Sequence, residues 1–196
     1  MSWTRRELFR SLFQPGALGK RLGGIGPAVR VHTRLPDDAE WKKLLDAGVS
    51  GHFSRGQEEL LVRRFFRDRR DGVFVDAGCR QPEQQSGTCF LERYLGWSGV
   101  AIDRQDFSEP WRDLRPRSRF FQAELGEHEH NPGTTLDQVL EETGLESINF
   151  LSISVDLGDL AVLKGLDLRR YRPELIKIHC GPGQRVPTFE YLGTFG

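Results

Sequence analysis

Two aspartates, Asp76 and Asp103, each end an apolar run and could together hold a nucleoside. Asp76 closes "VFVD" and is followed two residues later by Gly78, while Asp103 closes the next apolar run, "GVAID". A glycine at a strand end lets a ligand approach the backbone, and the amides that open the next helix can receive an anionic group. A carboxylate after the second strand can accept hydrogen bonds from ribose hydroxyls. The alternative is that both aspartates only cap helices.

The turn after the first run argues against one class of cofactor. A dinucleotide site needs the pattern G-x-G-x-x-G, so that a pyrophosphate can sit against bare backbone. The sequence "GCRQPE" offers only Gly78. NAD is therefore not expected. S-adenosylmethionine (SAM) has no phosphate, and its aminocarboxylate does not need a turn with three glycines.

Elements of a doubly wound domain can be placed around these aspartates. From residue 72 onward, short apolar runs alternate with helical segments, and the runs are continuous rather than alternating with polar residues. This pattern is typical of a parallel sheet that is covered on both faces by helices. We expect an α/β, mostly parallel Rossmann-like sheet of about five strands, with ligands at the carboxyl ends of the strands. The expected strands are 72–78, 98–104, 118–125, 148–155 and 173–180, and the expected helices are 39–48, 56–72, 89–97, 134–145 and 160–168.

The chain divides into an N-terminal part, 1–36, and a domain, 37–196. Residues 2–13 have the spacing of an amphipathic helix, and residues 14–36 are rich in Gly, Pro and Arg with little periodicity, which is typical of a flexible arm. Helices over 39–48 and 56–72 would then precede the first strand.

Composition limits the partners and the compartment. The 28 basic and 28 acidic residues balance, so no overall field recruits nucleic acid. Three cysteines without a C-x-x-C pair favour a reducing compartment. No run approaches the roughly 20 apolar residues of a membrane helix. We expect a cytoplasmic protein with no integral membrane segment.

Longer motifs occur in a fixed order along the domain: "FSRGQEELLVRRFF", "GVFVDAGCRQPEQQSGTCFLERYLGWSGVAID", "TLDQVLEETGLESINFLSISVDLGDLAVLKGLDL" and "RPELIKIH". They resemble the FkbM-type SAM-dependent methyltransferases over roughly residues 53–179. The resemblance implies a class I methyltransferase fold with SAM at the carboxyl edge of the sheet. It also implies methyl transfer to a hydroxyl, here of a small molecule or a glycan precursor.

Five cofactor-binding positions follow from this resemblance. Asp76 and Gly78 match the family's first-strand acidic and glycine positions, and Thr88 and Glu92 match the threonine and glutamate of its next helix. Asp103 matches the acidic residue that binds ribose, in agreement with the residue-based argument above.

Other positions depart from the family pattern. Arg80 replaces a small polar residue after the glycine, and it could pair with the SAM carboxylate or fill the methionine pocket. Ser154 replaces the first acidic residue after the fourth strand, and Asp156 a glutamate. His179 and Asp156 are the candidate catalytic bases. The alternatives are a structural or SAM-adjacent role for Asp156 and a backbone-bonded, strand-end role for His179.

The C-terminal segment is short for a full class I fold. His179 is followed by "CGPGQRVPTFEYLGTFG", which is too short for a sixth and a seventh strand with their helices. The fifth strand would then be an exposed edge through which two chains could form a homodimer. "TFEYLGTFG" could add one short strand or pair with a second chain.

Two charged stretches have alternative explanations. "AELGEHEHN" could ligate a metal, but a solvated polar loop explains it better. The four arginines of "WRDLRPRSR" could meet an anionic substrate, with a solvated helix-and-turn face as the alternative; they are Arg112, Arg115, Arg117 and Arg119.

Two functions remain open at the level of the sequence. One is a SAM-dependent O-methyltransferase. The other is a non-catalytic Rossmann-like module for binding or assembly, favoured by the altered residues at the strand ends.

Overall fold

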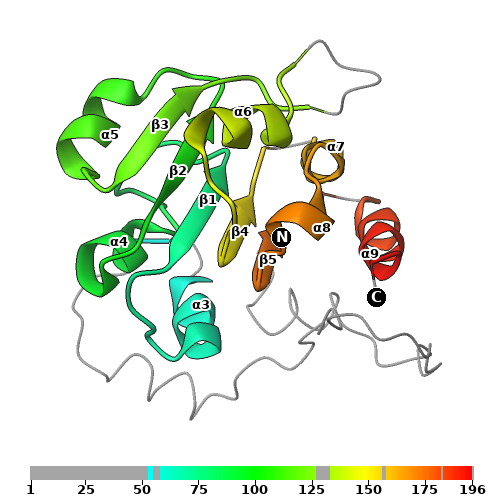
Figure 1. The fold of residues 1–196 in the computed structure, drawn as a ribbon, viewed down its shortest axis with the longest axis horizontal. Helices are drawn as coiled ribbons and strands as arrows, with labels where there is room; N and C mark the ends of the chain where they lie inside the picture. The colour runs from blue at the N-terminus through cyan, green and yellow to red at the C-terminus, as the bar shows by residue number, and fades with distance from the viewer. Residues whose placement is uncertain (1–52, 55–57, 127–132, 156–157, 182, 196) are drawn as a thin grey trace, which may run out of the picture.

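The structure, a computed structural model, describes residues 53–54, 58–126, 133–155, 158–181 and 183–195. These residues form a five-stranded parallel sheet in the order β3-β2-β1-β4-β5 (Figure 1). The expected doubly wound, Rossmann-like α/β fold is confirmed. The strands are β1 Val73–Ala77, β2 Ser98–Asp103, β3 Ser118–Gln122, β4 Phe150–Ile153 and β5 Leu175–Ile178. The helices are α3 Glu58–Phe66, α4 Cys89–Leu95, α5 Ser108–Leu114, α6 Leu136–Thr143, α7 Asp159–Lys164, α8 Leu168–Tyr171 and α9 Arg185–Gly193.

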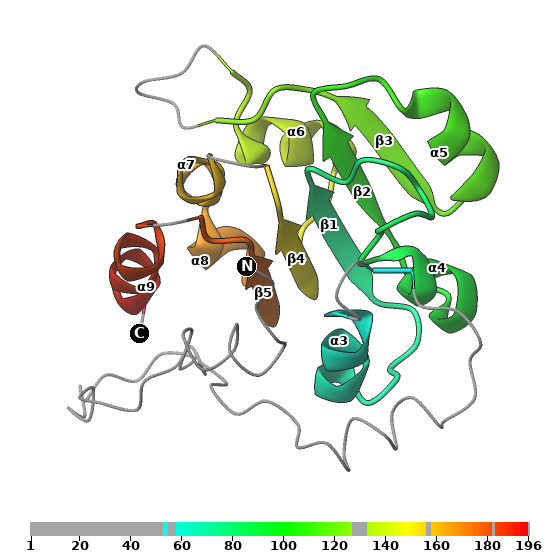
Figure 2. The same ribbon diagram turned by 180° about the vertical axis from the view of Figure 1, so that it is seen from behind.

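Helices cover both faces of the sheet (Figures 1 and 2). Because side chains alternate along a strand, Val75 and Phe74 point to opposite faces. Val75 belongs to a core with the apolar side chains of α6, α7 and α8. Phe74 belongs to a second core with Phe150 and the apolar side chains of α3 and α4. Trp111 of α5 and Ala101 of β2 form a third cluster with Cys79.

The strand order reverses between β1 and β4, and this is the place where ligands bind in open α/β sheets. β1 lies between β2 and β4, with Asp76 beside Ala101 on one side and beside Ser152 on the other. The turns that follow β1 and β4 are therefore neighbours at the carboxyl edge. Any ligand of this edge would meet the residues just after Ala77 and Ile153.

Local sequence signals explain where α6 begins and ends. Thr135 is its N-cap, and its side chain accepts a hydrogen bond from the Gln138 amide while the Gln138 side chain accepts one from the Thr135 amide. This capping box satisfies two amides that the helix leaves unbonded. Gly144 ends the helix in a left-handed conformation, φ 71°.

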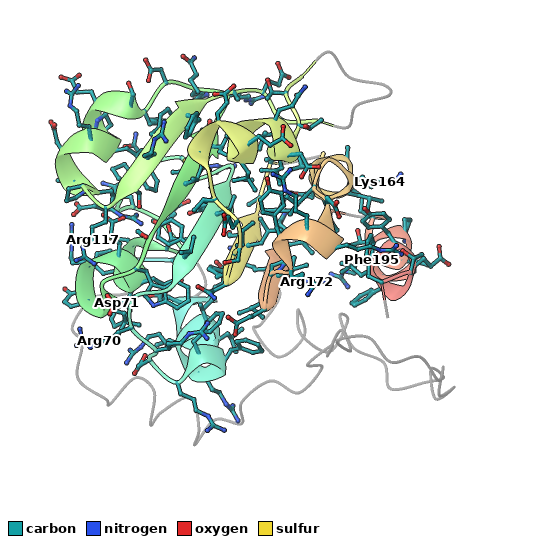
Figure 3. The ribbon with its side chains drawn as sticks, in the orientation of Figure 1. Arg70, Asp71, Arg117, Lys164, Arg172 and Phe195 are labelled. Carbon is teal, nitrogen blue, oxygen red and sulfur yellow. The ribbon has the colours of Figure 1, made fainter. Side chains whose placement is uncertain are left out.

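The C-terminal segment forms a helix, so the expectation of a short strand in "TFEYLGTFG" is wrong. Tyr191 and Leu192 of α9, and Phe195 just after its end, pack against the same core as the β5 side chains Ile176 and Ile178. Their partial burial against this core outweighs the strand propensity of the aromatic residues. Figure 3 labels Phe195 beside α9, on the side of the molecule away from Arg117.

The N-terminal expectations fall partly on described residues. The helix expected over 56–72 is found as α3, and it ends at Phe66. A tight turn follows, in which Arg67, Asp68 and Asp71 have positive φ values of 53°, 53° and 57°. The arm 1–36 and the helix 39–48 lie outside the described residues, so the proposed domain boundary stays a prediction. No helix in the described part of the chain is long and apolar enough to cross a membrane.

Candidate cofactor site

The turn after β1 starts at Gly78, which has φ 79°. The amides of Gly78 and Cys79 both donate to the Ile102 carbonyl, at 2.8 and 3.2 Å. A β-carbon on Gly78 would lie 2.1 Å from the carbonyl oxygen of Ser154. The glycine is therefore required by the close packing of the β1 and β4 turns, in addition to its backbone conformation.

Asp103, at the end of β2, holds this turn in place. Its Oδ2 accepts the Arg80 amide at 3.0 Å, and its Oδ1 accepts the Gln105 amide at 2.9 Å. Arg80 itself has φ 55°, and its carbonyl accepts the indole N–H of Trp111 at 2.8 Å. The Arg80 side chain is exposed, while Asp103 is 8% exposed. Asp103 thus lies at the predicted ligand edge and orders the loop that would receive the ligand.

Asp76 lies below the turn and is buried. The hydroxyl of Thr88 donates to its Oδ2 at 2.9 Å. Burial raises the pKa of Asp76 because it disfavours the charged form; nearby Lys177, the Thr88 hydroxyl, Arg115 and the Ser152 hydroxyl act against this shift. Asp76 and Asp103 point to the same face of the sheet, since Asp76 pairs with Ala101, two residues before Asp103.

The thiol of Cys79 lies in the field of both aspartates. Burial and the negative charges of Asp76 and Asp103 raise the pKa of Cys79 well above its usual range. A thiol in this state stays protonated at neutral pH, so Cys79 is a packing residue rather than a nucleophile.

Arg115 is buried, whereas the sequence predicts either an arginine that meets an anionic substrate or one on a solvated face. It is 1% exposed, at the C-cap of α5. Its Nε donates to Glu92 Oε2 at 2.8 Å, and its Nη1 donates to the Pro82 carbonyl at 2.7 Å. The expected exposed arginine face is wrong at this position, because a carboxylate and a backbone carbonyl replace the water that the guanidinium loses.

Glu92 of α4 has protein partners on both carboxylate oxygens. Besides Arg115, its Oε2 accepts a hydrogen bond from the Ser118 hydroxyl, and its Oε1 accepts the Arg117 amide at 2.9 Å. These bonds tie α4 to the beginning of β3. The structure therefore places Glu92 in the framework below the loop.

The predicted residues on the β4 and β5 side have different surroundings. Ser154 is half-buried, and its amide donates to the Ala77 carbonyl at 2.8 Å. His179 is exposed directly after β5, and its amide donates to the Ile153 carbonyl at 2.9 Å. Asp156 lies outside the described residues. Ser154 and His179 thus follow neighbouring strands at the carboxyl edge, where Gly78 and Asp103 also lie.

Cavities occur away from the two aspartates. A cavity of about 460 Å³ adjoins the carboxyl end of β5 and is lined by Cys180, Gly181, Gly183, Arg185 and Val186. Another, of about 560 Å³, lies over the exposed side of α6 and is lined by Thr134, Gln138, Glu141 and Glu142. Among the described residues, no group of three His, Cys, Asp or Glu side chains could hold a metal ion. The histidines of "EHEHN" lie outside that part of the chain.

Comparisons with known proteins assign no family and no function to this chain. No family model matches the chain, and no curated protein matches it. One solved structure, the X-ray structure of YjhP from E. coli, matches with 15% identity and a TM-score of 0.36. The match covers 63% of this chain and 47% of YjhP, so this chain spans about half the length of that protein. At these values the match carries no functional argument, and the resemblance to the FkbM-type family stays a prediction.

Proposed function

We propose that the carboxyl edge of the sheet binds SAM and that the protein transfers a methyl group to a hydroxyl of a small molecule or a glycan precursor. The observation that carries this proposal is the position of Asp103. It ends β2 beside the switch point of the sheet and fixes the turn after β1 through the Arg80 amide. A carboxylate at this position is the ribose-binding group of Rossmann-like folds.

The residues at this edge fit the adenosine and the aminocarboxylate of SAM. Each oxygen of Asp103 accepts one backbone amide. A carboxylate offers roughly four acceptor positions, so capacity remains for two ribose hydroxyls. The exposed Arg80 side chain stands on the turn and can pair with a carboxylate. Asp76 and Thr88 support the turn from below through their hydrogen bond.

SAM supplies, when bound, a methyl group activated by its sulfonium. The protein has to orient the acceptor and take up the hydroxyl proton. His179 is the described residue best suited to that proton, because it is an exposed imidazole at the carboxyl end of β5. Imidazole is the side chain that most often acts as a general acid or base in enzymes.

A second candidate function is a non-catalytic module for binding or assembly. Glu92 and Thr88 have internal partners that explain them without a ligand. Ser154 replaces an acidic residue of the resembled family, and the cavity beside β5 does not reach Asp103. These observations favour a protein that has the fold of the resembled family and does not catalyse methyl transfer.

A calorimetric titration with SAM and with its demethylated product, S-adenosylhomocysteine, tests the first proposal. Saturable binding followed by methyl transfer in a screen of hydroxyl compounds would support the enzyme. Binding without transfer to any compound of the screen would support the module. An absence of binding at millimolar ligand would contradict the SAM site.

A further inference from the structure

The guanidinium of Arg115 is the most extensively bonded side chain below the candidate site. Nε donates to Glu92, and Nη1 donates both to the Pro82 carbonyl and to Ser86 Oγ, at 2.7 and 3.2 Å. Nη2 donates to Thr88 Oγ1 at 3.2 Å. All three nitrogens of one buried group are therefore used, and all but one of these bonds lead to the segment 82–88.

That segment follows directly on the turn that carries Arg80. Just before the segment, Asp103 holds the Arg80 amide; at its end, Thr88 donates to Asp76. Between these points Arg115 supplies the bonds to Pro82 and Ser86. Because α4 begins at Cys89, directly after Thr88, the guanidinium also fixes the place where the helix starts.

The surroundings of Arg115 select a planar guanidinium. Its Cζ lies 4.5 Å from the centre of the Trp111 ring and 5.6 Å from the centre of the Phe74 ring. A guanidinium can stack on an aromatic face while its edge donates several hydrogen bonds in one plane, which the compact ammonium of lysine cannot do. Trp111 also donates to the Arg80 carbonyl, so one indole contacts both the guanidinium and the turn.

We propose that Arg115 is a positioning residue of the carboxyl-edge site. It sets the conformation of the segment 82–88 and, through this segment, the affinity of the edge for an adenosyl ligand. It acts through Pro82, Ser86 and Thr88 and does not itself contact the ligand. The statement about affinity rests on the proposed function, while the statement about the segment stands without it.

The experiment compares Arg115→Lys and Arg115→Met with a control of similar stability loss. Leu140→Ala is a suitable control because Leu140 is fully buried in the opposite core, with the α7 and α8 side chains. Amide hydrogen exchange is read at Ser86, Thr88 and Cys89, whose amides are bonded within the segment. The dissociation constant of S-adenosylhomocysteine is measured on the same samples by calorimetry.

We expect Arg115→Lys to remain folded, because it keeps a cation beside Glu92, and to exchange these three amides at least tenfold faster than the control. Its affinity for S-adenosylhomocysteine should be at least tenfold weaker than that of Leu140→Ala. Equal exchange and equal affinity in the lysine variant and the control would overturn the proposal. If Arg115→Met does not fold, the lysine variant alone decides.

Failure of the two claims can be told apart. A wild-type protein that does not bind S-adenosylhomocysteine contradicts the proposed function, and the exchange rates still decide whether Arg115 orders the segment. Wild-type binding together with control-like exchange in Arg115→Lys contradicts the role of Arg115 and leaves the SAM site standing.

Discussion

The carboxylate of Asp103 holds the backbone amide of Arg80 at 3.0 Å, so the end of β2 fixes the turn that follows β1. The same carboxylate holds the Gln105 amide after its own strand. One side chain therefore orders two neighbouring loops at the edge where Rossmann-like folds bind ligands. Because these two loops are already ordered, they lose less conformational entropy when a ligand binds.

Gly78→Ala should destabilise the protein more than Gly183→Ala. Both glycines have positive φ, 79° and 80°, so both substitutions add strain of about 1 kcal/mol. Only at Gly78 would the new β-carbon meet backbone, 2.1 Å from the Ser154 carbonyl, whereas nothing lies within 4 Å at Gly183. We expect urea unfolding to show a loss of about 3 kcal/mol at Gly78. Equal losses at the two positions would contradict the close packing of the β1 and β4 turns.

Asp76 should make the protein less stable as the pH rises. Its folded-state pKa is raised by burial, so the folded protein holds this proton more tightly than the unfolded chain. The stabilising contribution is complete below the unfolded-state pKa of aspartate and is lost as the pH rises through the folded-state pKa. Between about pH 4 and pH 7, the free energy of unfolding of the wild type should therefore fall relative to that of Asp76→Asn. A wild type that gains stability relative to the variant over this range would contradict a raised pKa for Asp76.

Glu92→Gln should cost about 3 kcal/mol of unfolding free energy, because it leaves the buried guanidinium of Arg115 without its counter-charge. The matched control is Glu174→Gln, which alters the ion pair with Arg69 at 2.7 Å, where both side chains are about two-fifths exposed. That change should cost about 1 kcal/mol or less. Chemical denaturation of the two variants checks the difference, and similar losses would argue against a buried ion pair below the site.

His179→Asn should separate binding from turnover. If the exposed imidazole accepts the hydroxyl proton, its loss should lower the methyl-transfer rate by about a hundredfold. The affinity for S-adenosylhomocysteine should stay the same, because the adenosine contacts are assigned to Asp103. Single-turnover rates and calorimetry on the same variant test this. An unchanged rate would contradict the catalytic role and leave His179 as a strand-end residue bonded through the backbone.

Most of the fold follows from the sequence because its signals are local. Continuous apolar runs predict every strand of the sheet, and the helix expected over 134–145 is found as α6. The C-terminal segment could not be assigned in this way. The aromatic residues of this segment have strand propensity, and the partial burial of Tyr191 and Phe195 against the core decides their conformation.

The candidate site could be predicted only in part. Asp76 and Asp103 are recognisable because each ends an apolar run. The burial of Arg115 was missed because nothing local distinguishes it from Arg112 or Arg117 in the same stretch. Its burial depends on Glu92, which is distant in the sequence, and on the cluster around Trp111. Long-range partners of this kind leave no signal in residue type or spacing.

The assignment of Asp103 to the ribose is tested by a calorimetric titration of the wild type and of Asp103→Ala with S-adenosylhomocysteine. A charge-assisted hydrogen bond to a ribose hydroxyl contributes about 1.5–3 kcal/mol, so the account predicts binding to the wild type and at least about tenfold weaker binding to the variant. Equal affinities, or no binding to a wild-type protein at millimolar ligand, would contradict it.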